Sequence, residues 1–218
     1  QASENDYLKS SGYKTNKTGV SIGTNFEYLN DFYLGVNNSH FYEKIETNST
    51  ASAMQKKQEG NYWDSFIRLD FNYDKRNQKF QTDSGFKSFY SLDLPIISDT
   101  NTIKNYYNYS HYFDFFEKNF SSISIHLQSA NSLNNKNIKL SERVTIPSNR
   151  LRGFEAGRIG PKDGDDYIGG NYTTTLNFEA QLPNLLPESY RTDFSLFLDT
   201  ANIWGVDYAD IAETNTIR

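Results

Sequence analysis

The chain of 218 residues contains no cysteine, which excludes disulfide bonds and metal sites built on thiolates. It also lacks a run of about eighteen consecutive apolar residues, so we expect no transmembrane helix. Lysine and arginine number 22 against 27 acidic residues, and without a long basic block nucleic-acid binding is not expected. The sequence holds no nucleophile–base arrangement and no phosphate-binding loop, so we expect neither an enzyme nor a cofactor.

Aromatic residues are abundant by contrast. Tyrosine, phenylalanine and tryptophan make up 16% of the chain, whereas disordered chains are poor in them. Many fall in segments that alternate apolar and polar residues, the pattern of a half-exposed β-strand. In "YWDSFIRLDFNYD", Trp63, Ile67 and Leu69 share one face, while Asp64 and Arg68 share the other. The pattern predicts about eight strands and no helix longer than about three turns.

Two architectures fit strands of this kind. One is a soluble antiparallel sheet with a core on its apolar face, and the other is a transmembrane barrel with lipid on that face. Charges in mid-strand, such as Arg68, Asp70 and Glu179, favour the barrel. So does the length of the connections: "LND", "FEKN" and "LPNLLPES" are short, whereas "ETNSTASAMQKKQEG" and residues 131–170 are long. We therefore expect an all-β fold, a segment of an antiparallel transmembrane β-barrel.

Residues 151–170, "LRGFEAGRIGPKDGDDYIGG", stand out because they hold six of the thirteen glycines between two expected strands. This segment resembles the signature loop of the BamA family of outer-membrane-protein insertases of Gram-negative bacteria. That loop carries [VL]RGF, then Gly-Pro-Lys/Arg, then an acidic stretch, then Gly-Gly before a strand. All four parts occur here in that order, and the matching residues are Leu151, Arg152, Gly153, Phe154, Gly160, Pro161, Gly169 and Gly170.

The resemblance implies a fold, a location and a function. Residues 1–218 would form a partial transmembrane β-barrel domain, about eight strands of a barrel of about sixteen, with the loop 131–170 in the lumen. The family's POTRA repeats and terminal barrel strands have no counterpart in it, and we expect an interior piece of a longer protein. The implied function is to insert and fold β-barrel proteins in the bacterial outer membrane. The implied partners are outer-membrane lipids, unfolded outer-membrane proteins and assembly lipoproteins.

The resemblance also implies a role for Arg152, with Glu179 and Asp199 as its acidic partners on the barrel wall. Alternation independently places both carboxylates on the polar face of their strands. A guanidinium offers a rigid fork of donors that suits carboxylates, and glycines let a backbone pass close to inward side chains. We expect Arg152 within hydrogen-bond distance of at least one of the two, as the only strong directional candidate for an anchor in the motif.

The facing of the strands follows from the same pattern. We expect unpaired sheet edges near residues 16–28 and 192–204, unless other segments of the chain cover them. Arg68, Asp70, Asn177, Glu179 and Asp199 should point inward. The convex, lipid-facing set should contain Trp63, Ile67, Leu69, Leu92, Leu94, Leu176, Phe178, Leu196 and Leu198.

Other readings remain open at this point. Residues 163–166 carry three aspartates but lack the spacing and the terminal glutamate of an EF-hand, and the three histidines are scattered, so we expect no metal site. A two-partner secretion or translocation pore of the same superfamily and a passive porin are the alternatives within the membrane. The number of POTRA repeats before this segment and the final barrel strands after it would distinguish these alternatives.

Overall fold

The protein is described by a computed structural model that covers residues 2–7, 12–114, 120–182, 189 and 194–206. The expected turns "FEKN" (116–119) and "LPNLLPES" (182–189) lie, except for their end residues Leu182 and Ser189, outside these residues. No helix in the described part of the chain has the length and apolar character needed to cross a membrane.

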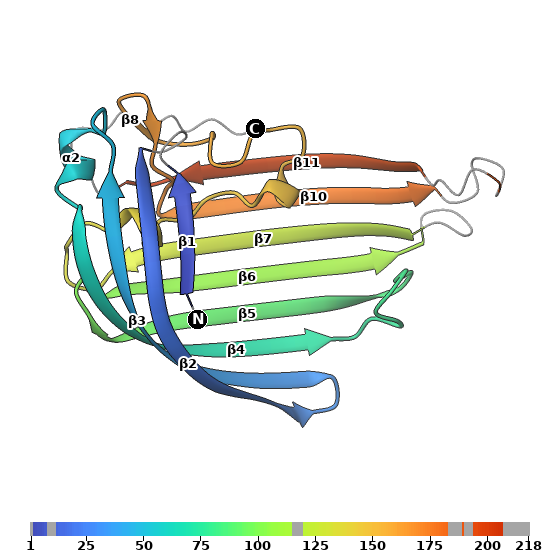
Figure 1. Cartoon of the computed structure of the whole chain (residues 1–218). Helices are drawn as coiled ribbons and strands as arrows, with labels where there is room; N and C mark the ends of the chain where they lie inside the picture. Colours follow the sequence, from blue (N-terminus) through green and yellow to red (C-terminus); the bar gives the residue numbers. More distant parts are fainter. Residues whose placement is uncertain (1, 8–11, 115–119, 183–188, 190–193, 207–218) are drawn as a thin grey trace.

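Nine antiparallel strands form one open, curved sheet, so the expected all-β antiparallel fold class is confirmed (Figure 1). Each strand pairs with the one before it in sequence, except that β10 follows β7 directly. The strands are β1 (Ala2–Tyr7), β2 (Tyr13–Leu29), β3 (Phe32–Thr47), β4 (Gly60–Asp74), β5 (Gly85–Ser98), β6 (Thr102–Phe113), β7 (Phe120–Ser132), β10 (Tyr172–Leu182) and β11 (Phe194–Trp204). The connections carry the short elements α2 (Ala53–Lys56), η1 (Leu140–Glu142), η2 (Ser148–Arg150), β8 (Lys162–Asp163) and β9 (Asp166–Tyr167).

The eight long strands lie where alternation predicts them, and the short β1 is an addition. β1 pairs with β2 from Tyr13 to Thr18, so a further segment of the chain covers the start of the edge expected near residues 16–28. From Val20 onward, β3 is the sheet partner of β2 among the described residues. At the other end of the sheet, β11 has β10 as its only described neighbour.

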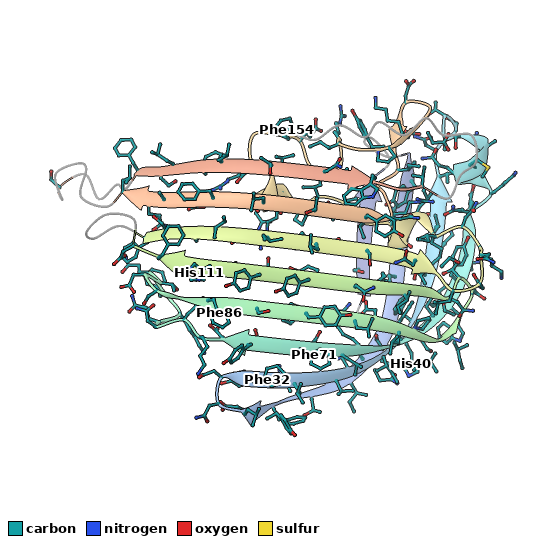
Figure 2. All side chains as sticks on the ribbon, turned by 180° about the vertical axis from the view of Figure 1, so that it is seen from behind. Phe32, His40, Phe71, Phe86, His111 and Phe154 are labelled. Atoms are coloured by element: carbon teal, nitrogen blue, oxygen red, sulfur yellow. The ribbon has the colours of Figure 1, made fainter. Side chains whose placement is uncertain are left out.

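The expected facing agrees with the burial of the side chains. None of the nine apolar residues assigned to the convex face is buried, and Trp63, Leu196 and Leu198 are each more than 60% exposed. Aromatic rings form a row across β3 to β6 through Phe32, Tyr73, Phe86 and Tyr109, with centroids 5.4–6.1 Å apart. Figure 2 shows Phe32 and Phe86 toward one end of the strands, as in an aromatic girdle.

The core lies between the concave face of the sheet and the long connection between β7 and β10, residues 133–171. We name this connection the inner loop. It is two residues shorter at its start than expected and one residue longer at its end, and it contains η1, η2, β8 and β9. Its apolar side chains pack in three small clusters: Ile146 and Leu151 with Ala201 and Ile203, Leu140 and Ile168 with Tyr13, and Ile138 and Val144 with Ala130.

Candidate functional site

A patch of four side chains on β10 and β11 forms the floor of the site. Asn177 pairs with Asp199 across the two strands, and Glu179 pairs with Phe197. Because residues two apart in a strand share a face, all four side chains project from the same side of the sheet. The patch therefore presents two carboxylates, one amide and one aromatic ring to the inner loop.

All three guanidinium nitrogens of Arg152, in the inner loop, donate hydrogen bonds to this patch. Its Nε and Nη2 donate to the two carboxylate oxygens of Asp199 at 2.7 and 2.8 Å, and its Nη1 donates to Glu179 Oε2 at 2.7 Å. The backbone N–H of Arg152 donates to Asp199 Oδ2 at 3.0 Å. The guanidinium also lies 3.8 Å from the centre of the Phe197 ring, a cation–π geometry.

The carboxylates of Asp199 and Glu179 do not contribute equally to the binding of Arg152. The side chain of Asp199 is 3% exposed, whereas those of Arg152 and Glu179 are 29% and 33% exposed. The hydrogen bond to Asp199, more than that to Glu179, raises the pKa of Arg152 above its usual value. Asp199 is thus the principal partner, because a buried carboxylate depends on its counter-charge more than a half-exposed one does.

Asn177 connects this ion pair to the loop backbone. Its Nδ2 donates to Asp199 Oδ1 at 2.8 Å and to the carbonyl oxygen of Arg150 at 2.7 Å. The Arg150 side chain in turn donates to Asn108 of β6 at 2.5 Å. Residues 150–152 are therefore held to the wall through side chains and backbone alike.

The remaining residues of the signature differ in their surroundings. Leu151 is 3% exposed and packs against Ala201 and Ile203 beneath the loop, and Pro161 is fully buried. Phe154, by contrast, is 48% exposed, and Figure 2 shows it on the loop above the strands. Leu151 thus joins Arg152 at the wall, whereas the aromatic ring of the motif does not.

The glycines of the signature serve two physical purposes. A Cβ on Gly160 would lie 2.4 Å from Ile203 Cγ2, and one on Gly169 would lie 2.7 Å from the carbonyl oxygen of Val144. Gly170 is similarly close to the backbone of Trp204. At Gly153 a Cβ would meet open space, but its φ of +84° favours glycine. Close approach therefore explains the later glycines, and backbone conformation explains the first.

Alanine at Gly160 is expected to loosen the inner loop more than alanine at Gly157. Both positions have positive φ, which costs a residue with a Cβ about 1–2 kcal/mol. Only Gly160 also faces Ile203, and overpacking there adds about 1–3 kcal/mol. Limited proteolysis of the full-length variants measures the difference, and equal cleavage rates would show that the contact with Ile203 has no effect.

The inner loop has further anchors that sequence reasoning missed. Lys139 is 1% exposed, and its ammonium group donates to Glu43 Oε2 at 3.1 Å and to Asp64. Arg143 donates to Asn171 at 3.1 Å. Lys139 and Arg143 lie outside the motif at residues 151–170, so they add to the anchor that the motif predicts. No motif marks Lys139, and the strand carboxylates Glu43 and Asp64 are 96 and 75 residues away in the sequence.

Two of the three aspartates at residues 163–166 contact the β3–β4 connection, Asp163 through Ser52 and Asp166 through Gln55. Asp163 accepts a hydrogen bond from Ser52, which caps α2. Burial, together with the neighbouring Asp165 and Asp163, raises the pKa of Asp166. Within the described ranges, no group of three or more His, Cys, Asp or Glu residues could hold a metal ion.

Comparisons with known proteins agree with this architecture. The family model of the Omp85 superfamily domain matches residues 1–218. Over 68 residues the chain is 41% identical to a SAM50-like protein of Schizosaccharomyces pombe (strain 972), a match that covers 31% of this chain and 14% of that protein. The crystal structure of BamA from Haemophilus ducreyi lacking POTRA domains 1–3 has a similar fold, with a TM-score of 0.78 and 21% identity over 88% of this chain and 42% of that one. The chain thus spans less than half the length of either protein.

Proposed function

Because the chain belongs to the Omp85 superfamily, we propose that it forms part of the wall of an insertase for β-barrel proteins of the bacterial outer membrane. Residues 1–218 are then a partial transmembrane barrel domain whose convex face contacts outer-membrane lipids. The exposed apolar side chains of that face and the ionic groups of the concave face support this location. The inner loop lies in the lumen of the complete barrel.

One observation carries the proposal. Arg152 engages Asp199 and Glu179 together, and it fixes a glycine-rich loop against two neighbouring strands. Ordering such a loop costs about 1–2 kcal/mol of backbone entropy per residue, so the anchor must be strong. We infer that the docked loop shapes the inner wall during insertion. Its substrates are unfolded outer-membrane proteins, and assembly lipoproteins are its partners.

No chemical step belongs to this proposal. The groups around Arg152 are an ion pair, an amide and an aromatic ring, which position a loop but offer no nucleophile beside a base. The work of insertion would come from strand pairing and from transfer of apolar surface into lipid. We therefore propose an assembly factor that uses neither nucleotide nor cofactor.

Depletion of the full-length protein tests the proposal in cells. We expect the folded forms of many outer-membrane barrel proteins to decline together, while their unfolded precursors accumulate. The measurement is the fraction of each protein that migrates as a folded, heat-modifiable species on gels. Loss of a single secreted protein with normal levels of folded barrels would contradict the proposal and indicate a secretion pore instead.

A further inference from the structure

The first half of the inner loop has an ionic anchor of its own around Lys139. Its ammonium group contacts carboxylates from three elements: Glu43 of β3, Asp64 of β4 and Glu142 of η1. The side chain of Lys139 is 1% exposed, and those of Glu43, Asp64 and Glu142 are 3%, 0% and 5% exposed. We name these residues the Lys139 cluster. It is far more buried than the ion pairs of Arg152, whose side chain is 29% exposed.

Hydroxyl groups complete the Lys139 cluster. Thr100 and Thr102 donate to Glu142 Oε2 at 2.9 and 2.6 Å, and Ser141 donates to Glu43 at 2.9 Å. Asp64 accepts a further hydrogen bond from Ser98. The cluster therefore joins the loop to β3, β4, β5 and the start of β6.

The balance of charge makes Lys139 critical. Lys139 contacts all three carboxylates, while Lys17 interacts with Glu43 and Glu142 only at longer range, so removal of Lys139 would leave buried negative charges without the cation that they contact. Burial by itself lowers the pKa of Lys139, but the carboxylates of Glu142, Glu43 and Asp64 together raise it above the usual value. The lysine is thus held in its charged form.

The backbone on both sides of Lys139 is also held. The Leu140 N–H donates to Gln58 Oε1 at 2.8 Å, and Gln58 Nε2 donates to the carbonyl oxygen of Ile138 at 3.5 Å. Gln58 comes from the β3–β4 connection, which also contributes Met54 to the apolar cluster of Leu140. The lysine is therefore presented to its carboxylates by a preformed backbone.

The Lys139 cluster and Arg152 lie on separate parts of the wall. Lys139 contacts carboxylates of β3 and β4, with Ser98 of β5 and Thr102 of β6 at the edge of its cluster, whereas Arg152 contacts β10 and β11. In the sheet, β5, β6 and β7 lie between β4 and β10. A cavity of about 580 Å³ separates the intervening loop from these strands, with Asp93, Lys104 and Gln128 on the wall side and Thr145 and Pro147 on the loop side. Between the two anchors, Val144 packs against Ala130 of β7 and Ile146 packs against Ala201 and Ile203 of β11, so apolar contacts accompany the ionic anchors along this span.

We propose that Lys139 is a positioning residue and that its cluster is a second anchor of the inner loop, independent of Arg152. Held by both anchors, the loop connects β3 and β4 with β10 and β11. We expect this connection to support assembly, which rests on the proposed function, because it keeps the curvature of the wall while substrate strands pair. The anchor itself does not depend on that function. Each anchor controls the opening of its own half of the loop.

Limited proteolysis of the full-length protein in outer-membrane vesicles tests this division. Proteinase K is used, and cleavage sites are mapped by mass spectrometry. Lys139→Met is expected to increase the cleavage rate within residues 133–145 about tenfold or more, with little change within residues 153–160. Arg152→Ala is expected to do the reverse. The matched control is Lys136→Met, which changes an exposed lysine of the same loop and should leave both rates unchanged.

Two results would overturn the second anchor. If Lys139→Met opens both halves equally, the loop is one cooperative unit; if it opens neither, the cluster does not hold the loop. Heat-modifiable migration checks that the barrel has folded. Should Lys139→Met not fold, Asp64→Asn decides by the same pattern with a smaller effect, since it retains Lys139 and two carboxylates. Loosening of the first half with normal assembly of outer-membrane proteins would sustain the anchor and contradict the proposed function.

Discussion

Arg152→Ala is expected to lower the assembly of outer-membrane proteins about tenfold or more and to expose the second half of the inner loop to protease. The substitution removes the hydrogen bonds that Arg152 Nε and Nη2 donate to Asp199 and that its Nη1 donates to Glu179. Asp199, whose side chain is 3% exposed, then keeps only Asn177 and one backbone N–H as donors. We expect a cost of about 2–4 kcal/mol, because the pair is buried on the side of Asp199 and half-exposed on that of Glu179.

Two further variants separate geometry from charge. Arg152→Lys should restore assembly only in part, since an ammonium group cannot engage two carboxylates as a planar fork does. Arg158→Ala is the matched control, because Arg158 belongs to the same loop and pairs with Glu155 at 3.1 Å where both side chains are largely solvated. An exposed pair of this kind contributes about 0–1 kcal/mol. Equal effects of Arg152→Ala and Arg158→Ala would contradict the anchoring role of Arg152.

The second large effect is expected on the convex face of the sheet. Leu127 and Gln128 are neighbours on β7, and they project to opposite sides. Leu127 is 41% exposed on the convex face, whereas Gln128 lines the cavity beneath the inner loop. Leu127→Arg should destabilise the inserted barrel by about 2–4 kcal/mol, the cost of a lipid-facing arginine near the middle of the membrane.

Gln128→Arg is the matched control, since it adds the same side chain at the same depth but on the wet side. The measurement is the free energy of unfolding in lipid vesicles, followed by the loss of heat-modifiable migration in urea. We expect the control to lie within about 1 kcal/mol of the unchanged protein. A larger loss for Gln128→Arg than for Leu127→Arg would mean that the convex face does not contact lipid.

Alternation was sufficient to predict the long strands and the side chains that face outward. The prediction succeeds because every outward position on the convex face has the same apolar requirement. Trp63, Leu196 and Leu198 are therefore all exposed and apolar, although they lie on different strands. It fails for β1, whose sequence "ASENDY" has no apolar face. It also does not identify Phe66 as a core residue: this ring shares the polar face of Asp64 and Arg68, yet it is 4% exposed and stacks on Phe41.

The candidate site could be predicted only where a motif and a strand pattern coincide. Arg152 comes from the motif, and Glu179 and Asp199 come from the polar faces of the two strands that follow it. The Lys139 cluster has no such signal, since two of its carboxylates come from the paired strands β3 and β4 and no motif links them to Lys139 in the distant loop. Glu43 also lies on the same face of β3 as the apolar residues Phe41 and Ile45, so the alternation pattern does not predict an ionic site there.

On the proposed function, the protein inserts β-barrels into membranes in the state in which Arg152 holds the inner loop against the wall. The most direct measurement is the rate at which a purified, unfolded outer-membrane barrel protein becomes folded in lipid vesicles that contain the full-length protein. We predict a rate well above that of empty vesicles, which Arg152→Ala reduces about tenfold or more and Arg158→Ala leaves unchanged. A folding rate that is the same with Arg152→Ala as with the unchanged protein would contradict the claim.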